Sequence, residues 1–201
     1  MKRVSVFLMA CMTLSCITTS SAQEIKLGAA GNFGSTNWSN GYSDSKARVV
    51  FGIGGAGQYA ITDKFNVGAE LILSSIGPRI IDNGDGLYGR FSIPTIQIPL
   101  LASYKLIDKL EVHAGLQPSV LLAVNAVLDN SPYNGDKIDF SEDYGSFNMD
   151  FLLGASYDIT ENITGLIRIN KGLVDVETDR ESRDFKTTGV TFGLRYWLMK
   201  K

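Results

Sequence analysis

The chain has little cysteine and histidine, so the residues behind much thiol and metal chemistry are scarce. Its two cysteines, Cys11 and Cys16, both lie within the first 22 residues, and its one histidine is His113. If those first residues are removed, no disulfide, thiol nucleophile or cysteine-based metal site remains. We therefore expect neither a cofactor nor a metal site.

Two further absences limit the membrane topology and the partners. Beyond residue 22, no apolar run approaches the roughly 18 residues that mark a candidate transmembrane helix. Without Lys2 and Arg3, the remaining chain holds 17 basic and 21 acidic residues, a net charge of −4. A nucleic-acid partner would require a basic face, so this balance argues against one.

The segment 1–22 has the composition of a secretory signal peptide. It begins with Lys2 and Arg3, continues in an apolar run and ends with small residues, Ser20 and Ala22, placed for cleavage before Gln23. A membrane anchor is a weaker alternative because the apolar run is short and contains Ser and Thr. Lipoprotein cleavage at either cysteine is also weaker, because the preceding residues fit poorly.

The rest of the chain has a period of two, which predicts β-strands. In the stretch "IPTIQIPLLASYKL", residues 93–106, even positions are apolar and odd positions are largely polar. Seven other segments alternate in the same way: 25–33, 49–61, 65–73, 110–124, 147–159, 163–169 and 187–198. The sequence therefore predicts eight strands, an even number that can close as an up-and-down barrel.

The connections between these segments alternate in length. Three are short, at 62–64, 107–109 and 160–162. Four are long, at 35–47, 78–92, 125–146 and 174–184. Short turns on one side and long loops on the other are typical of outer-membrane barrels. The fold class that we predict is thus all-β: an eight-stranded antiparallel transmembrane barrel over 23–201, preceded by a cleaved signal peptide.

Aromatic residues indicate which face is outside. A soluble barrel such as a lipocalin would turn the apolar face inward. Here, aromatic residues of the apolar parity lie beside the short turns or the C-terminus, as expected where a barrel wall meets lipid headgroups: Tyr59, Phe65, Tyr104, Tyr157 and Tyr196. We therefore predict that apolar residues such as Leu71, Leu100 and Phe151 face lipid.

The two prolines of the 93–106 stretch need a place in this barrel, because proline lacks the N–H that a ladder requires. We expect Pro94 near the loop-side end of its strand, where the ladder ends. We expect Pro99 on the lumen side, at a bulge.

The stretch "IQIPLLASYKL" resembles a strand of the PorT-like outer-membrane β-barrel proteins, and "LLGASYDIT" and "INKGLVDVE" are similar to later strands of that family. The C-terminal Thr191, Gly193, Tyr196 and Leu198 resemble the signal that the barrel-assembly machinery reads on a last strand. The resemblance implies a small outer-membrane barrel of a Gram-negative envelope. It does not by itself imply a secretion role.

An eight-stranded barrel has an interior that side chains can fill, so we predict a plugged lumen rather than a pore. The lumen parity supplies a charge network of Glu70, Asp150, Arg168 and Arg195. Glu70 and Arg168 each lie five residues from the same rim, on strands that face each other. We expect these two to pair, directly or through Asp150.

The alternative functions are an outer-membrane lipid-modifying enzyme and a soluble periplasmic ligand-binding barrel. An outer-membrane lipid-modifying enzyme would need a nucleophile beside a base, but His113 faces the lumen and Ser119 lies far from it along the strand. The acidic loop segments, including Asp129, Asp136, Asp139, Glu142 and Asp143, lack the spacing of a calcium loop. We therefore expect a structural, adhesive or secretion-accessory protein. Its expected partners are outer-membrane lipid, the assembly machinery and envelope or surface proteins that its loops contact.

Overall fold

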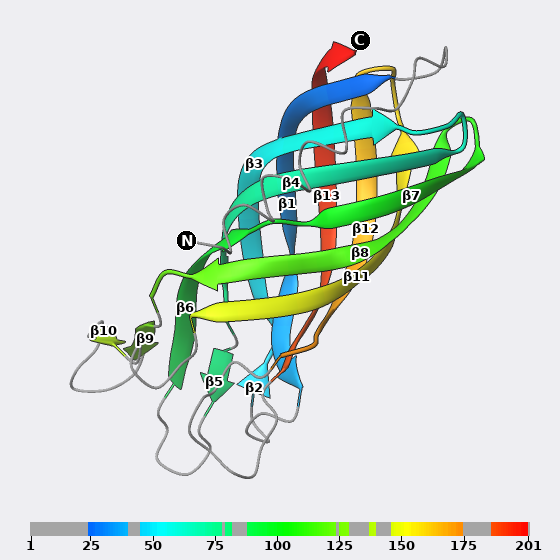
Figure 1. Ribbon diagram of the computed structural model, residues 1–201. Helices are drawn as coiled ribbons and strands as arrows, with labels where there is room; N and C mark the ends of the chain where they lie inside the picture. The colour runs from blue at the N-terminus through cyan, green and yellow to red at the C-terminus, as the bar shows by residue number, and fades with distance from the viewer. Residues whose placement is uncertain are drawn as a thin grey trace, which may run out of the picture.

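The computed structural model describes residues 24–39, 45–77, 79–81, 88–123, 125–128, 137–139, 146–174 and 186–200. The predicted signal peptide lies outside them. The described residues form a closed antiparallel β-barrel (Figure 1). None of them forms a helix of the length and hydrophobicity that a membrane-spanning helix requires.

Nine strands build the barrel wall: β1 (Ile25–Ser39), β3 (Arg48–Ala60), β4 (Phe65–Ile76), β6 (Tyr88–Gln97), β7 (Leu100–Ile107), β8 (Leu110–Leu121), β11 (Phe147–Asp158), β12 (Ile163–Gly172) and β13 (Lys186–Lys200). Because β6 and β7 occupy one position in the ring, the barrel has eight staves. Each stave pairs with its neighbour in sequence, and β13 pairs with β1 to close the ring. The predicted eight-stranded antiparallel barrel is confirmed.

The alternation places the predicted faces correctly. Leu100 is 49 % exposed on the outer face, whereas Gln97 on the same stave is 9 % exposed and faces the lumen. Leu71 and Phe151 are also outward and exposed, as predicted. The aromatic residues Tyr104, Tyr157 and Tyr196 are about half-exposed near the short turns. These outward positions are therefore apolar or aromatic.

We expected a bulge at Pro99, and this prediction is wrong. The structure has a break between β6 and β7 instead. Ile72 of β4 lies opposite Gln97, and Ala69 lies opposite Leu100, so the register is the same on both sides of Pro99. The Glu70 N–H donates to the Pro99 carbonyl at 2.9 Å. Proline removes only the reciprocal bond, because it has no N–H to return. Pro99 thus interrupts the ladder without shifting it.

Pro94 lies where the ladder between β6 and β8 ends, as predicted. Its carbonyl accepts a bond from the Leu122 N–H at 2.9 Å, just beyond the last β6–β8 pair. The stave itself does not end there, because β6 begins at Tyr88 and pairs with other strands. Pro94, which lacks an N–H, therefore lies where β6 changes its pairing partner from β8 to β9.

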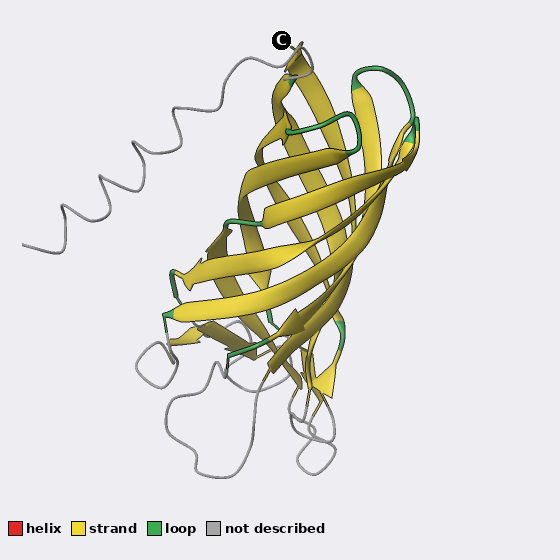
Figure 2. Cartoon of the chain, turned by 45° about the vertical axis from the view of Figure 1, so that its right-hand side comes forward, coloured by secondary structure: helices red, strands yellow, loops and turns green. Residues whose placement is uncertain are grey.

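The loop side contains more strand than the sequence predicted. β1 runs on to Ser39, and four short strands lie in segments expected to be loops: β2 (Ser45–Lys46), β5 (Arg79–Ile81), β9 (Asn125–Leu128) and β10 (Lys137–Asp139). They extend the wall beyond the membrane-facing strands, at the lower end of the barrel in Figures 1 and 2. Runs of two to four residues are too short to show a period of two, so the alternation missed them.

Two of the short turns share one design. In the turn after β3, the Thr62 hydroxyl accepts hydrogen bonds from the N–H groups of Lys64 and Phe65. In the turn after β11, Thr160 accepts in the same way from Asn162 and Ile163. The threonine supplies acceptors that the tight backbone turn cannot, which fixes both hairpins.

Candidate functional site in the barrel lumen

Three charged side chains meet in the middle of the lumen, and together with His113 they form what we call the central cluster: Glu70, His113, Arg168 and Arg195. Arg168 of β12 donates two hydrogen bonds to the Glu70 carboxylate of β4, from Nη1 at 2.8 Å and from Nη2 at 2.6 Å. Arg195 of β13 donates to the same carboxylate through Nε at 2.7 Å. All three residues are at most 5 % exposed. A bidentate, buried pair of this kind is geometrically specific.

His113 of β8 completes the cluster. Its Nε2 accepts a hydrogen bond from Arg168 Nε at 3.1 Å, which requires a neutral ring with the proton on Nδ1. Gly154 of β11 lies between the two residues in the sheet. A Cβ there would come within 2.7 Å of His113 Nε2 and 2.9 Å of Arg168 Cγ. Glycine at this position thus lets the two side chains meet.

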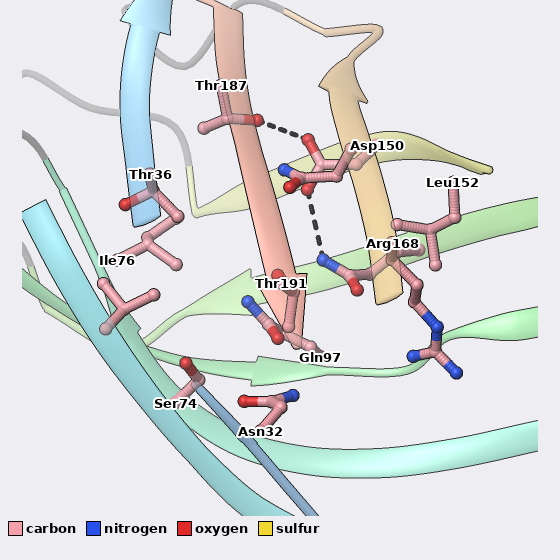
Figure 3. A pocket seen from close by; sticks show the side chains of 13 residues that line it. Asn32, Thr36, Ser74, Ile76, Gln97, Asp150, Leu152, Arg168, Thr187 and Thr191 are labelled. Carbon is pink, nitrogen blue, oxygen red and sulfur yellow. Dashed lines mark hydrogen bonds between the residues drawn. The ribbon is translucent and has the colours of Figure 1, made fainter. Parts of the chain in front are cut away.

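The structure brings Glu70, Arg168 and Arg195 together and places Asp150 in a separate group. Asp150 accepts from Gln117 Nε2 at 3.2 Å, from Asn148 Nδ2 at 3.2 Å and from the Thr187 hydroxyl. We call these four residues the Asp150 cluster. Figure 3 shows the Arg168 guanidinium turned away from this carboxylate. The Glu70–Arg168 contact is therefore direct and does not pass through Asp150.

A third polar layer lies near the short turns. Glu111 accepts hydrogen bonds from Gln58 at 3.0 Å and Asn66 at 2.8 Å. Trp197 donates from Nε1 to the Thr164 hydroxyl at 2.9 Å, and that hydroxyl donates to Asp158 at 2.5 Å. Trp197 is a lumen residue that we did not predict, although it has the same parity as Arg195.

Trp197 also connects this layer to the central cluster. The Arg195 guanidinium carbon lies 5.8 Å from the centre of the indole ring, a cation–π contact. Trp197 packs with three small or aliphatic lumen residues, Ala30, Ala56 and Ile72. The lumen is thus filled by apolar as well as polar side chains.

The cavity in the loop-side half of the lumen is small. It measures about 30 Å³ and is drawn in Figure 3. One water needs roughly 10–15 Å³, so the cavity accommodates one or two such molecules. Side chains of the central and Asp150 clusters, including Arg168 and Asp150, line it. The described lumen therefore has no room there for a continuous water column.

The residues proposed as an assembly signal divide between the faces of β13. Thr191 and Gly193 point to the lumen, whereas Tyr196 and Leu198 are exposed on the outside. This strand is the one that closes the barrel onto β1. Its recognition by the assembly machinery stays a prediction.

The described residues show no arrangement of side chains that supports an enzyme or a metal site. His113 accepts a hydrogen bond from Arg168, and the buried Ser119 hydroxyl has no hydrogen-bond partner in the part of the chain that the structure describes. No group of three or more His, Cys, Asp or Glu side chains in the described ranges is arranged to hold a metal. Of the acidic loop residues, only the backbone of Asp139, in β10, falls within the described segments; the others lie outside them.

Comparison with known proteins identifies the architecture. The family model described as outer membrane protein beta-barrel domain matches residues 20–177. Among solved structures, Ail, the attachment invasion locus protein of Yersinia pestis, bound to the heparin analogue sucrose octasulfate, has a TM-score of 0.52 at 11 % identity, covering 88 % of this chain and 99 % of its own. Neisserial surface protein A has a TM-score of 0.50 at 13 % identity, covering 89 % and 99 %. These likenesses are of fold. No curated protein matches the sequence.

Proposed function

The chain belongs to the outer membrane protein beta-barrel domain family, and from this premise we propose that it works through its loop-side surface, not as a pore or an enzyme. It is a small eight-stranded barrel of the outer membrane. The alternative of a soluble periplasmic barrel is therefore wrong. The role that we propose is structural, adhesive or secretion-accessory.

The filled lumen is the observation that carries this proposal. Three polar layers and an apolar cluster occupy the interior, and the loop-side cavity holds only one or two waters. A conducting pore would require these buried contacts to break together. The barrel interior is thus suited to support the wall rather than to pass solutes.

The two ends of the barrel differ in what they offer a partner. The short-turn end is formed by tight hairpins such as the one at Thr62. The other end carries the longer connections and the added strands β2, β5, β9 and β10. In outer-membrane barrels the longer loops are extracellular. We therefore place the interaction surface outside the cell, where envelope or surface proteins are the expected partners.

The enzyme alternative is disfavoured by where the only histidine lies. His113 is 2 % exposed and its Nε2 is occupied by Arg168. A lipid in the outer leaflet lies on the opposite side of the wall from this ring. A secretion role of the PorT-like kind remains a narrower form of the same proposal.

The test is affinity capture of the N-terminally tagged mature chain from envelopes solubilised in mild detergent. One variant replaces residues 129–136 with a Gly/Ser linker of equal length. The matched control carries Asp63→Asn and Asp108→Asn on the short turns. We expect a specific co-purifying protein that the linker variant loses and the control retains.

The same purified barrel should be placed in planar lipid bilayers. Stable channel currents would overturn the proposal that the lumen is plugged. Equal recovery of every partner by the linker variant and the control would overturn the expectation that residues 129–136 take part in the interaction.

A further inference from the structure

The outer wall of the barrel has a groove near its loop-side end. The groove has a volume of about 510 Å³ and crosses four neighbouring staves, β1, β13, β12 and β11, with Ala47 at its edge. Four of the side chains that line it are exposed on the outer face: Phe151, Leu153, Ile169 and Lys171. The groove therefore opens toward the membrane and not into the lumen.

The groove arises where bulky outward residues give way to smaller ones. Phe33 of β1 and Phe192 of β13 lie opposite each other, and their rings stack with centres 5.5 Å apart. The next outward positions of these two staves toward the loops hold smaller side chains: Ser35 and Val190, then Asn37 and Thr188. Because strand pairing keeps such residues side by side, the loss of bulk on both staves leaves a hollow in the wall.

The polarity of the lining changes in one step along the strands. One row of paired residues crosses the groove and is mostly apolar: Leu153, Ile169, Val190 and Ser35. The next row toward the loops is polar except for its first member: Phe151, Lys171, Thr188 and Asn37. A ligand that is apolar at one end and polar at the other would match both rows.

Lys171 lies at the depth expected for the headgroups of the outer leaflet. Ile163, eight residues earlier on β12, lies opposite Tyr196, one of the aromatic residues near the short turns. Eight residues at ~3.3 Å each, on a strand tilted by ~40°, advance about 20 Å along the barrel axis. The apolar band of such barrels is roughly 25 Å tall, so Lys171 lies near its extracellular edge. The flexible lysine stem lets the ammonium reach the headgroups.

The charge of the groove favours an anionic headgroup. Among the described residues that line it, none is acidic and Lys171 is basic. A second lysine, Lys186, is the next outward residue of β13 beyond Thr188. Lysine near a lipid surface attracts anionic headgroups.

We propose that this groove binds one anionic lipid of the outer leaflet, with an acyl chain along Leu153 and Ile169 and a headgroup phosphate at Lys171. The apolar row contacts the chain, and the polar row contacts the headgroup. The site is on the wall, so this proposal does not depend on the proposed role of the loops.

The experiment is native mass spectrometry of the barrel in a neutral detergent, titrated with dipalmitoyl phosphatidylglycerol. Dipalmitoyl phosphatidylcholine is the comparison, because it has the same chains and a headgroup without net charge. We expect one phosphatidylglycerol to bind more tightly than phosphatidylcholine. Inorganic phosphate should not displace it, because phosphate has no acyl chain to fill the groove.

Two variants test the two parts of the site. Lys171→Gln should lower the preference for phosphatidylglycerol by about fivefold, the effect of one lysine at an anionic surface. Ser35→Phe fills the groove and should abolish tight binding of both lipids. The matched controls are Lys64→Gln, at an exposed lysine of a short turn, and Ala29→Phe, on the outward face of β1 away from the groove. Both should bind as the wild type does, and gel mobility shows that each variant is folded.

The proposal is overturned if Ser35→Phe and Ala29→Phe bind phosphatidylglycerol equally well, or if Lys171→Gln keeps the full preference. Displacement by inorganic phosphate would identify a site for free anions and would overturn the assignment to a lipid. A dimer that Ser35→Phe abolishes would assign the groove to a second copy of the chain, which also overturns it. Because channel currents and partner capture are separate measurements, failure here leaves the proposed function standing.

Discussion

The two faces of the barrel wall differ in how strictly their side chains are specified. Leu71 and Glu70 are neighbours on β4, yet Leu71 is exposed on the outer face and Glu70 accepts bonds from two arginines in the lumen. An outward residue has only to be apolar, because lipid tails adapt to its shape. An inward residue has to match particular partners, because an unpaired polar group there is costly.

The lumen contacts also connect strands that the sheet does not. Glu70 of β4 and Arg168 of β12 lie on staves that are not neighbours in the ring. Their ion pair therefore spans the interior, while backbone ladders join only adjacent staves. On the inner face, the exact residue at a position matters. On the outer face, it is enough that the residue is apolar. Three pairs of substitutions test this difference.

The largest effect is expected for the ion pair of the inner face. Glu70→Gln leaves two buried guanidinium groups without their carboxylate, and it should cost about 3–5 kcal/mol. Adding Arg168→Met removes one of these unpaired charges, so the double variant should recover much of the loss. The measurement is a double-mutant cycle on urea unfolding in lipid vesicles.

Glu111→Gln is the control for this cycle, because Glu111 is a lumen carboxylate that accepts hydrogen bonds from two neutral side chains, Gln58 and Asn66. It should cost less than Glu70→Gln. A coupling energy near zero between Glu70 and Arg168 would mean that the two charges are independently solvated.

An arginine placed on each face of one stave compares the faces directly. Leu100→Arg puts a charge into the lipid near mid-depth and should cost about 2–4 kcal/mol. Gln97→Arg puts the same side chain on the lumen face, beside the cavity and Asp150, and should cost less. Folding yield and urea unfolding in vesicles measure both. Greater damage from Gln97→Arg would reverse the assignment of inside and outside.

Much of the fold was predictable because a strand repeats every two residues, and eight long segments have that period. Glu70 and Arg168 could be paired from sequence because both lie five residues from the same rim. The separate position of Asp150 could not be predicted. It depends on the stagger between staves and on Asn148 and Thr187, whose polarity is unremarkable in the sequence.

The errors have equally specific causes. Pro99 was expected at a bulge because its missing N–H suggested a break, but the ladder tolerates the loss of one bond without a change of register. Trp197 was overlooked because aromatic residues were counted only on the outer parity. Its position between Tyr196 and Leu198 already placed it on the lumen face.

The smallest expected difference comes from one substitution made on both faces. Thr164→Val keeps the side-chain shape but leaves the Trp197 Nε1–H without its acceptor and Asp158 without a donor. A buried donor left unsatisfied costs about 1–3 kcal/mol. Thr188→Val makes the same change on the outward face of β13, where the effect should stay within about 0.5 kcal/mol. Urea unfolding followed by gel mobility, with Trp197 fluorescence for the inner variant, measures both free energies. If the two substitutions cost the same, the hydrogen bonds of the lumen do not set the stability of this end, and its packing around Trp197 does.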